Sequence, residues 1–144
     1  MIAIAVSRFN EEVTAQLLKN CQAALVPHGF SGDKIAVFHV PGGYELPWLC
    51  NELALSDKYD VIIALGCILK GATPQNEHIA RSTIQHLHDI SIKTRVPVIL
   101  GVITPTAYAQ AVARTKGALD RGKEAAHAAL EVLKLRRELK ASNG

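Results

Sequence analysis

Four short stretches of the chain are almost free of polar residues, and the segments between them carry apolar residues every three to four positions. Apolar runs this short, rich in Val and Ile, are typical of strands buried on both faces of a parallel sheet. The spacing in the intervening segments is typical of helices with one buried face. The predicted strands are 2–7, 34–39, 61–69 and 96–103, and the predicted helices are 11–26, 44–55, 74–93, 104–114 and 123–139.

This alternation of strands and helices predicts an α/β fold. Right-handed crossovers then give a three-layer, flavodoxin-like arrangement, in which helices flank a four-stranded parallel sheet. Our hypothesis for the strand order is 2-1-3-4. The length of 144 residues predicts a single domain over 1–144. A sheet of four strands is small and leaves helix faces uncovered, so we expect the chain to form a homo-oligomer.

The third strand, 61–69, is followed by a loop that is suited to an anion. Lys70 and Gly71 end the strand, Thr73 is a plausible N-cap of the next helix, and Pro74 fits its first turn. Ligands of open α/β sheets bind beyond the carboxyl ends of the strands, and a helix N-terminus favours negative charge. The alternative is an ordinary connection with an incidental lysine.

Composition excludes several functional classes. The net charge of +3 is too small to indicate a nucleic-acid partner, and no apolar run is long enough to span a membrane. Three cysteines without a CxxC pair suggest reduced thiols and a cytoplasmic location. Neither a dinucleotide nor a nucleotide-triphosphate motif is present, and the six histidines are not spaced as metal ligands. The basic run 134–140 is interpreted as a solvated face that complements the helix dipole.

Four stretches in order along the chain carry a family resemblance: 7–10 (SRFN), 40–47 (VPGGYELP), 66–74 (GCILKGATP) and 96–104 (VPVILGVIT). A looser match covers 113–116 and 121–126. With these motifs the chain resembles the lumazine synthase family of riboflavin biosynthesis. The resemblance spans nearly the whole chain without large gaps.

The resemblance implies a reaction and an assembly. Members condense 5-amino-6-(D-ribitylamino)uracil with 3,4-dihydroxy-2-butanone 4-phosphate to form 6,7-dimethyl-8-ribityllumazine, through an imine, loss of phosphate and ring closure. It implies no cofactor and no metal. It also implies homopentamers or multiples of pentamers, with each site at an interface between subunits, and small-molecule substrates as the partners.

By position, the resemblance assigns binding of the pyrimidine and the ribityl chain to eight residues: Phe9, Asn10, Gly43, Tyr44, Glu45, Cys67, Ile68 and Leu69. Phe9 is expected to stack on the pyrimidine ring, with a core position as the alternative. Asn10 is expected to bound the pocket and to cap the first helix. Glu45 is expected to accept bonds from ribityl hydroxyls, the alternative being a first-turn carboxylate that favours the helix dipole. Main-chain groups of 67–69 are expected to face the pyrimidine edge.

The same comparison assigns the butanone phosphate to the amides of Gly71, Ala72 and Thr73 at a helix N-terminus. Arg114 is expected to reach this phosphate from the adjacent subunit, or else to be an exposed arginine near a helix end. Arg121 stands where the family usually has lysine, which keeps the charge and changes the geometry.

Two positions depart from the family pattern. Gln75 replaces the histidine that serves as general acid or base, and Leu100 replaces an aromatic residue that packs over the pyrimidine. We therefore expect lowered catalytic efficiency. His78 lies three residues beyond Gln75 on the same predicted helix, so one hypothesis is that Gln75 bonds the substrate while His78 or water moves protons. The alternative places His78 at the surface or at an interface.

Two other functions stay open from the sequence. A non-catalytic paralogue would keep the lumazine or flavin pocket without the chemistry, and a structural paralogue would only build a shell. Gln75, at the position of the family's histidine, is the feature that distinguishes an enzyme from the non-catalytic paralogue.

Overall fold

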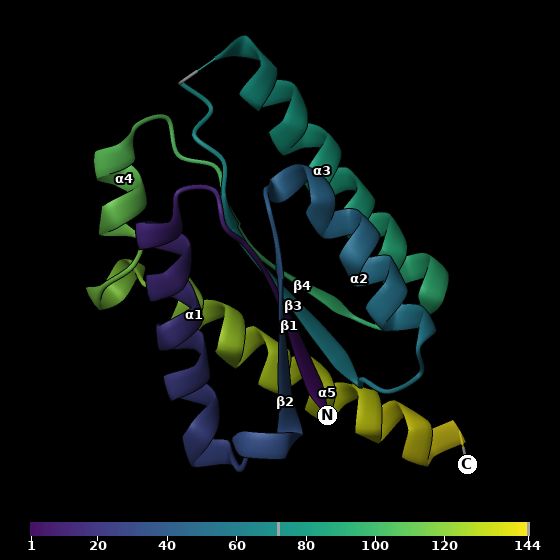
Figure 1. Ribbon diagram of the computed structural model, residues 1–144. Coiled ribbons are helices and arrows are strands. Elements are labelled where there is room, and N and C mark those ends of the chain that lie inside the picture. The colour runs from purple at the N-terminus through teal and green to yellow at the C-terminus, as the bar shows by residue number, and fades with distance from the viewer. Residues whose placement is uncertain (72, 144) are drawn as a thin grey trace.

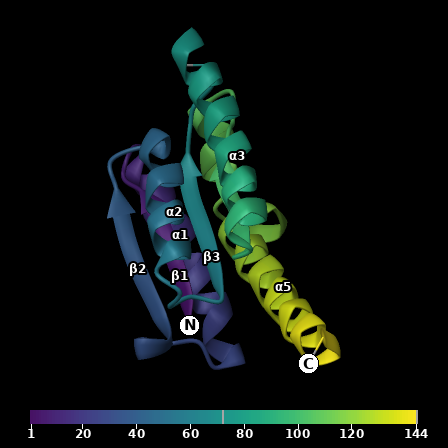
Figure 2. The ribbon, with the colours of Figure 1, turned by 90° about the vertical axis from the view of Figure 1, so that its right-hand side faces the viewer.

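A computed structural model of the chain describes residues 1–71 and 73–143. Its strands are β1 (Ile2–Ser7), β2 (Ile35–Val40), β3 (Val61–Cys67) and β4 (Val98–Ile103). They form one parallel sheet in the order β2-β1-β3-β4, as the sequence predicts (Figure 1). β2 and β4 are its edges, and Figure 2 shows β2 along one side of the molecule.

Helices cover both faces of the sheet. α1 (Glu11–Leu25) and α5 (Arg121–Asn143) pack together on one face, and α2 (Leu46–Leu55) and α3 (Pro74–Thr94) pack together on the other (Figure 1). α4 (Tyr108–Ala113) is a short helix between β4 and α5. The predicted three-layer α/β arrangement is therefore confirmed.

The core has two halves because side chains alternate across the sheet. Ile2, Ile4 and Val6 of β1 belong to the half under α1 and α5, whereas Ala3 and Ala5 belong to the half under α2 and α3. All of these side chains are buried. Both central strands are covered on both faces, which explains why they are apolar throughout.

The fourth strand is less buried than predicted. Leu100 is 42% exposed and Val98 is only half-buried. β4 lies at an edge, where no further strand covers it. The apolar pattern of β4 therefore reflects a surface as well as a core.

Several boundaries differ from the prediction for local reasons. α4 begins at Tyr108 instead of 104, because the preceding backbone continues alongside the end of β3 and Lys70 N donates to Pro105 O at 3.0 Å. The predicted loop 115–122 contains a short 3₁₀ helix, Gly117–Leu119, and α5 already begins at Arg121 and continues to Asn143.

Candidate functional site

The loops at the carboxyl ends of β1, β2 and β3 surround a cavity of about 140 Å³. Eight residues singled out in the sequence line it together: Phe9, Asn10, Gly43, Tyr44, Glu45, Cys67, Ile68 and Leu69. Gly42, Asn76 and Ile79 complete the lining. Segments that lie far apart in the sequence therefore meet here because parallel strands all end at the same edge of the sheet.

The turn after β1 is fixed by the loop after β2. Arg8 N donates to Val40 O at 2.9 Å, and Phe9 N donates to Pro41 O at 2.9 Å. Asn10 then adopts a left-handed conformation with φ 60°, which asparagine tolerates better than most residues. This main-chain path places Phe9 at the rim of the cavity.

Asn10 is the N-cap residue of α1, as predicted, and its main-chain oxygen accepts from Val13 N at 2.9 Å. The side chain makes no cap bond, and its Nδ2 donates to the main-chain oxygen of Cys67 at 3.0 Å. Asn10 thus ties the end of β1 to the end of β3, where ladder pairing between these strands has stopped. It lines the cavity and holds two of its walls at a set distance.

Two aromatic rings stand open to solvent at the rim. Phe9 is 65% exposed and Tyr44 is 69% exposed. The Phe9 ring lies directly over Gly42, where a Cβ atom would come within 2.6 Å of Phe9 Cδ2. The ring can therefore approach the main chain only because residue 42 is glycine. A core position for Phe9 is excluded.

Glu45 is held by a reciprocal pair of bonds. Gly42 N donates to Glu45 Oε1 at 2.9 Å, and Glu45 N donates to Gly42 O at 3.1 Å. This capping box closes the turn Gly43–Glu45 before α2. One carboxylate oxygen thus has a structural role, and the carboxylate still borders the cavity.

The main-chain N–H groups just beyond β3 point alternately toward β4 and away from it. Ile68 N and Lys70 N both point to the β4 side, donating to Ile103 O and Pro105 O at 3.0 Å. Because successive amides of an extended chain point in opposite directions, Leu69 N–H points toward β1 and the cavity. No acceptor for this amide is found among residues 1–71 and 73–143. Leu69 N–H is therefore a main-chain donor that a ligand in the cavity could use.

The start of α3 follows directly. Thr73 Oγ1 accepts from Asn76 N at 3.2 Å, so the predicted cap is confirmed, and Pro74 occupies the first turn. Asn76 Nδ2 reaches back to Leu69 O at 2.9 Å. Gly71 packs against Thr106, where a Cβ atom would lie 2.2 Å from the Thr106 main-chain oxygen. Ala72 lies outside the described residues.

Gln75 and His78 are exposed and do not line the cavity of their own chain. The face of α3 turned toward it carries Asn76 and Ile79, which the sequence interpretation did not single out. The signal for Asn76 was its position three residues after the cap Thr73, where a polar side chain can fold back on the preceding loop.

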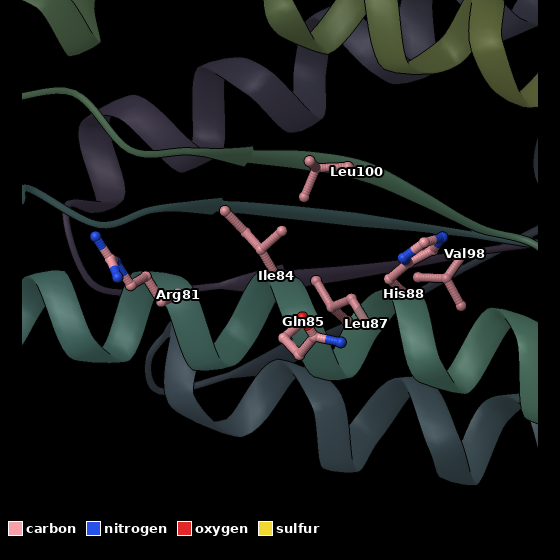
Figure 3. A pocket seen from close by; sticks show the side chains of 7 residues that line it. All are labelled: Arg81, Ile84, Gln85, Leu87, His88, Val98 and Leu100. Carbon is pink, nitrogen blue, oxygen red and sulfur yellow. The ribbon is translucent and has the colours of Figure 1, made fainter.

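Leu100 lies in a different concavity, an open groove of about 580 Å³ between α3 and β4. Figure 3 shows Ile84 of α3 and Leu100 of β4 pointing toward each other across this groove. Arg81, Gln85 and His88 add polar groups to its lining. This groove contains none of the strand-end loops, so Leu100 and Phe9 do not share a cavity within one chain.

The two predicted arginines also lie outside the cavity lining. Arg114 is half-buried, and its Nη1 donates to Gln110 O at 3.2 Å. Arg121 Nε lies 3.2 Å from Glu124 Oε2. Arg114 stands at the C-terminal end of α4, and neither arginine touches the Phe9 cavity of its own chain.

Burial raises the pKa of the Cys67 thiol to about 11, and the nearby Arg114 charge lowers it only in part. A thiol with this pKa stays protonated near neutral pH and is a poor nucleophile. Among residues 1–71 and 73–143, no three His, Cys, Asp or Glu side chains gather as a metal site would require. Nor does any helix in these ranges have the length and apolar character to cross a membrane.

A comparison with family models identifies this arrangement. The model described as 6,7-dimethyl-8-ribityllumazine synthase matches residues 1–137. The chain belongs to this family. Lumazine synthases are transferases of riboflavin biosynthesis, and the match covers every segment that lines the cavity.

Proposed function

We propose that this lumazine synthase homologue condenses 5-amino-6-(D-ribitylamino)uracil with 3,4-dihydroxy-2-butanone 4-phosphate to 6,7-dimethyl-8-ribityllumazine. The observation that carries the proposal is the cavity at the strand ends. It combines an exposed aromatic ring, a main-chain donor and a carboxylate, and it adjoins the N-terminus of a long helix. Family membership supports the same chemistry.

The pyrimidine is proposed to lie on Phe9. Stacking on this ring contributes on the order of 0.5–1.5 kcal/mol beyond the area it buries. Leu69 N–H then faces the heterocycle edge and donates to a ring oxygen or nitrogen. Glu45 accepts from ribityl hydroxyls through the carboxylate oxygen that Gly42 does not use. Gly43 and Tyr44 flank the same chain.

The butanone phosphate is proposed to sit at the N-terminus of α3. The first amides of a helix have no intrahelical acceptors, and its dipole favours negative charge there. Thr73 Oγ1 satisfies the Asn76 amide. The amides of Gly71 and Thr73 are proposed to face the phosphate. Lys70, which is exposed at the end of β3, adds positive charge nearby.

A second subunit is proposed to complete the site. The cavity of about 140 Å³ is smaller than the roughly 300–1,000 Å³ typical of ligand sites, so further walls are needed. Leu100, Arg114 and Arg121 lie outside it in their own chain and fit the role of those walls in a neighbouring one. A homopentamer, or a larger assembly of pentamers, provides this arrangement.

Acid–base catalysis is proposed to contribute little to the rate. Glutamine cannot exchange a proton near neutral pH, and a positioned general base contributes typically about 10²–10⁴-fold. Holding two reactants in register lowers a barrier by up to about 7–11 kcal/mol, so juxtaposition alone gives a slow but real enzyme. In this scheme Gln75 bonds the substrate, and His78 or water carries protons.

The test is an assay with both substrates that follows product absorbance. We expect product to form faster than in the protein-free mixture. Replacing His78 by alanine should lower turnover by at least about tenfold if His78 carries the proton, whereas an unchanged rate would remove His78 from the mechanism.

The change at position 75 favours one alternative, a paralogue that binds lumazine or flavin without catalysis. That function predicts saturable binding of the product together with a condensation rate equal to the protein-free rate. The same assay therefore distinguishes the two functions.

A further inference from the structure

A second concave surface lies at the opposite end of the sheet from the Phe9 cavity. It is a groove of about 690 Å³ between the last turns of α5 and the segment that leads into β4. In Figure 1 both chain termini lie at this end, whereas the loops of the candidate site lie at the other. The groove uses part of the basic run 134–140, which the proposed reaction does not employ.

One wall of the groove is an apolar strip along α5. Val132, Leu135 and Leu139 recur at helical spacing on one face, and Pro97 faces them from the start of β4. Leu135 is 53% exposed and Leu139 is 54% exposed. At 1.5 Å per residue the strip from Val132 to Leu139 is about 10 Å long. A narrow apolar strip of this length suits an extended hydrocarbon tail.

The polar groups of the groove are three cations and an amide, with no carboxylate in the lining. None of the salt bridges found within 1–71 and 73–143 involves Arg95, Arg136 or Lys140. Arg136 is fixed in place because its Nη1 donates to the main-chain oxygen of Asp60. The Asp60 carboxylate lies outside the lining and is engaged by the Met1 amine at 2.8 Å. The Met1 amine and, more weakly, the charges of Arg136 and Lys140 lower the pKa of Asp60, so this carboxylate offsets part of the charge of the three cations. The groove therefore has an excess of positive charge at its rim.

From the apolar strip and these three cations, we propose that the groove binds an organic anion with an unbranched apolar tail, such as a medium-chain carboxylate. The head group would lie between Arg95 and Lys140, and the tail along Leu135 and Leu139. The volume falls within the range of ordinary small-ligand sites. A neighbouring chain in a cyclic oligomer would meet this face with a different surface, which would have to supply acidic groups to match its charge. The proposal is independent of the condensation reaction.

The test measures binding to the full-length assembled protein by calorimetry, with two ligands that share a tail. Sodium decanoate carries the anionic head, and decyltrimethylammonium carries a cationic head of the opposite sign. Both are used below the concentrations at which they form micelles. We expect decanoate to bind saturably, with one site per chain, and about tenfold more tightly than the cation.

Matched variants locate the site. Lys140→Glu reverses a charge at the groove, whereas Arg137→Glu makes the same change on an exposed part of α5 outside its lining. We expect roughly threefold to tenfold weaker decanoate binding for the first and no change for the second. Leu139→Gln tests the apolar strip in the same way. Leu119→Gln is its matched control, because Leu119 is 61% exposed and lies elsewhere on the chain.

Three results would overturn the proposal. One is equal affinity for the two head groups, which would indicate a non-selective apolar surface. Another is an equal effect of Lys140→Glu and Arg137→Glu. The third is binding to anionic lipid vesicles without any binding of monomeric decanoate. This result would indicate that the cations of the groove bind a membrane surface instead of a small ligand.

Discussion

The side-chain amide of Asn10 donates a hydrogen bond of 3.0 Å to the main-chain oxygen of Cys67, which is 57 residues further along the chain. The bond takes over where the ladder between β1 and β3 ends at Val6 and Leu65. The bond therefore connects the segment that carries Phe9 to the main chain of residues 67–69. Because Asn10 is also left-handed, one residue sets both the turn and the width of the cavity.

Replacing Asn10 by alanine should lower the free energy of unfolding by about 2–3 kcal/mol. The lost bond leaves a partly buried carbonyl and contributes about 1 kcal/mol, and a left-handed alanine costs roughly another 1–2 kcal/mol. Asn10→Gly removes the bond without the left-handed cost, so its loss should be smaller. Denaturant unfolding of the two variants measures both parts. Equal losses would show that the conformation at residue 10 is not strained by a side chain.

Gly42 is expected to control the position of the Phe9 ring. In Gly42→Ala the new methyl group would meet the ring at 2.6 Å, so the ring must move away. Since φ at Gly42 is −141°, alanine fits the backbone and stability should change little. We expect about tenfold weaker binding of the pyrimidine substrate, comparable to loss of the stacking contact. Phe9→Ala should weaken binding to a similar extent, and normal binding by Gly42→Ala would contradict the stacked geometry.

Substitutions at Thr73 test the helix cap at the proposed phosphate site. Thr73→Ala removes the acceptor for Asn76 N and should cost about 1 kcal/mol of stability, whereas Thr73→Ser keeps it. In the assay the alanine variant should raise KM for the butanone phosphate while the serine variant stays near wild type. If serine and alanine behave alike, the hydroxyl has no part in ordering this helix end.

Gln110 links two segments of the proposed phosphate site. Gln110 Oε1 accepts from Thr106 N at 2.8 Å, and Thr106 packs on Gly71. The main-chain oxygen of Gln110 accepts from Arg114 Nη1. Gln110→Leu removes the side-chain acceptor and should raise KM for the phosphate substrate about fivefold, the equivalent of one ordinary hydrogen bond. Gln110→Glu retains an acceptor and should restore KM. A failure of glutamate to restore it would indicate a role in packing alone.

The three cysteines predict loss of stability in alkaline solution. Burial raises the pKa of Cys21 and Cys50 to about 12 and that of Cys67 to about 11, from 9.0. Above pH 9 the unfolded chain releases these protons while the folded chain retains them, so the free energy of unfolding falls as pH rises. The slope is at most about 1.4 kcal/mol per pH unit for each thiol. Cys50→Ala should flatten the fall between pH 9 and 11, and an unchanged slope would assign it to other groups.

Hydrophobic patterning predicted the sheet well for a physical reason. Strands 2–7 and 61–69 are apolar without a break because the central strands of a parallel sheet are covered on both faces. Right-handed crossovers alone do not fix the strand order, and 2-1-3-4 was a hypothesis for a flavodoxin-like sheet that the structure confirms. Leu100 was harder to place, because the same apolar residue is compatible with a core and with an exposed edge.

The cavity was predictable only at the level of its segments. Strand ends converge in any parallel sheet, so Phe9, Glu45 and Leu69 were brought together as expected. Asn10 was expected to cap the first helix, and it does occupy that position. Its side chain bonds Cys67 instead of the nearest helix amide, and this long-range partner is invisible in local sequence. For Asn76 the local signal was its position after Thr73, but its bond to Leu69 depends on how the loop turns.

The central claim is that two ligands meet at the strand ends, with a heterocycle on Phe9 and a phosphoryl group over Thr73. A crystal structure of the protein soaked with a ribitylaminopyrimidine analogue and inorganic phosphate tests it most directly. The account predicts the ring stacked on Phe9, with Leu69 N–H at its edge, and phosphate at the amides that begin α3. Density for neither ligand at this rim, at concentrations that saturate binding in solution, would contradict it.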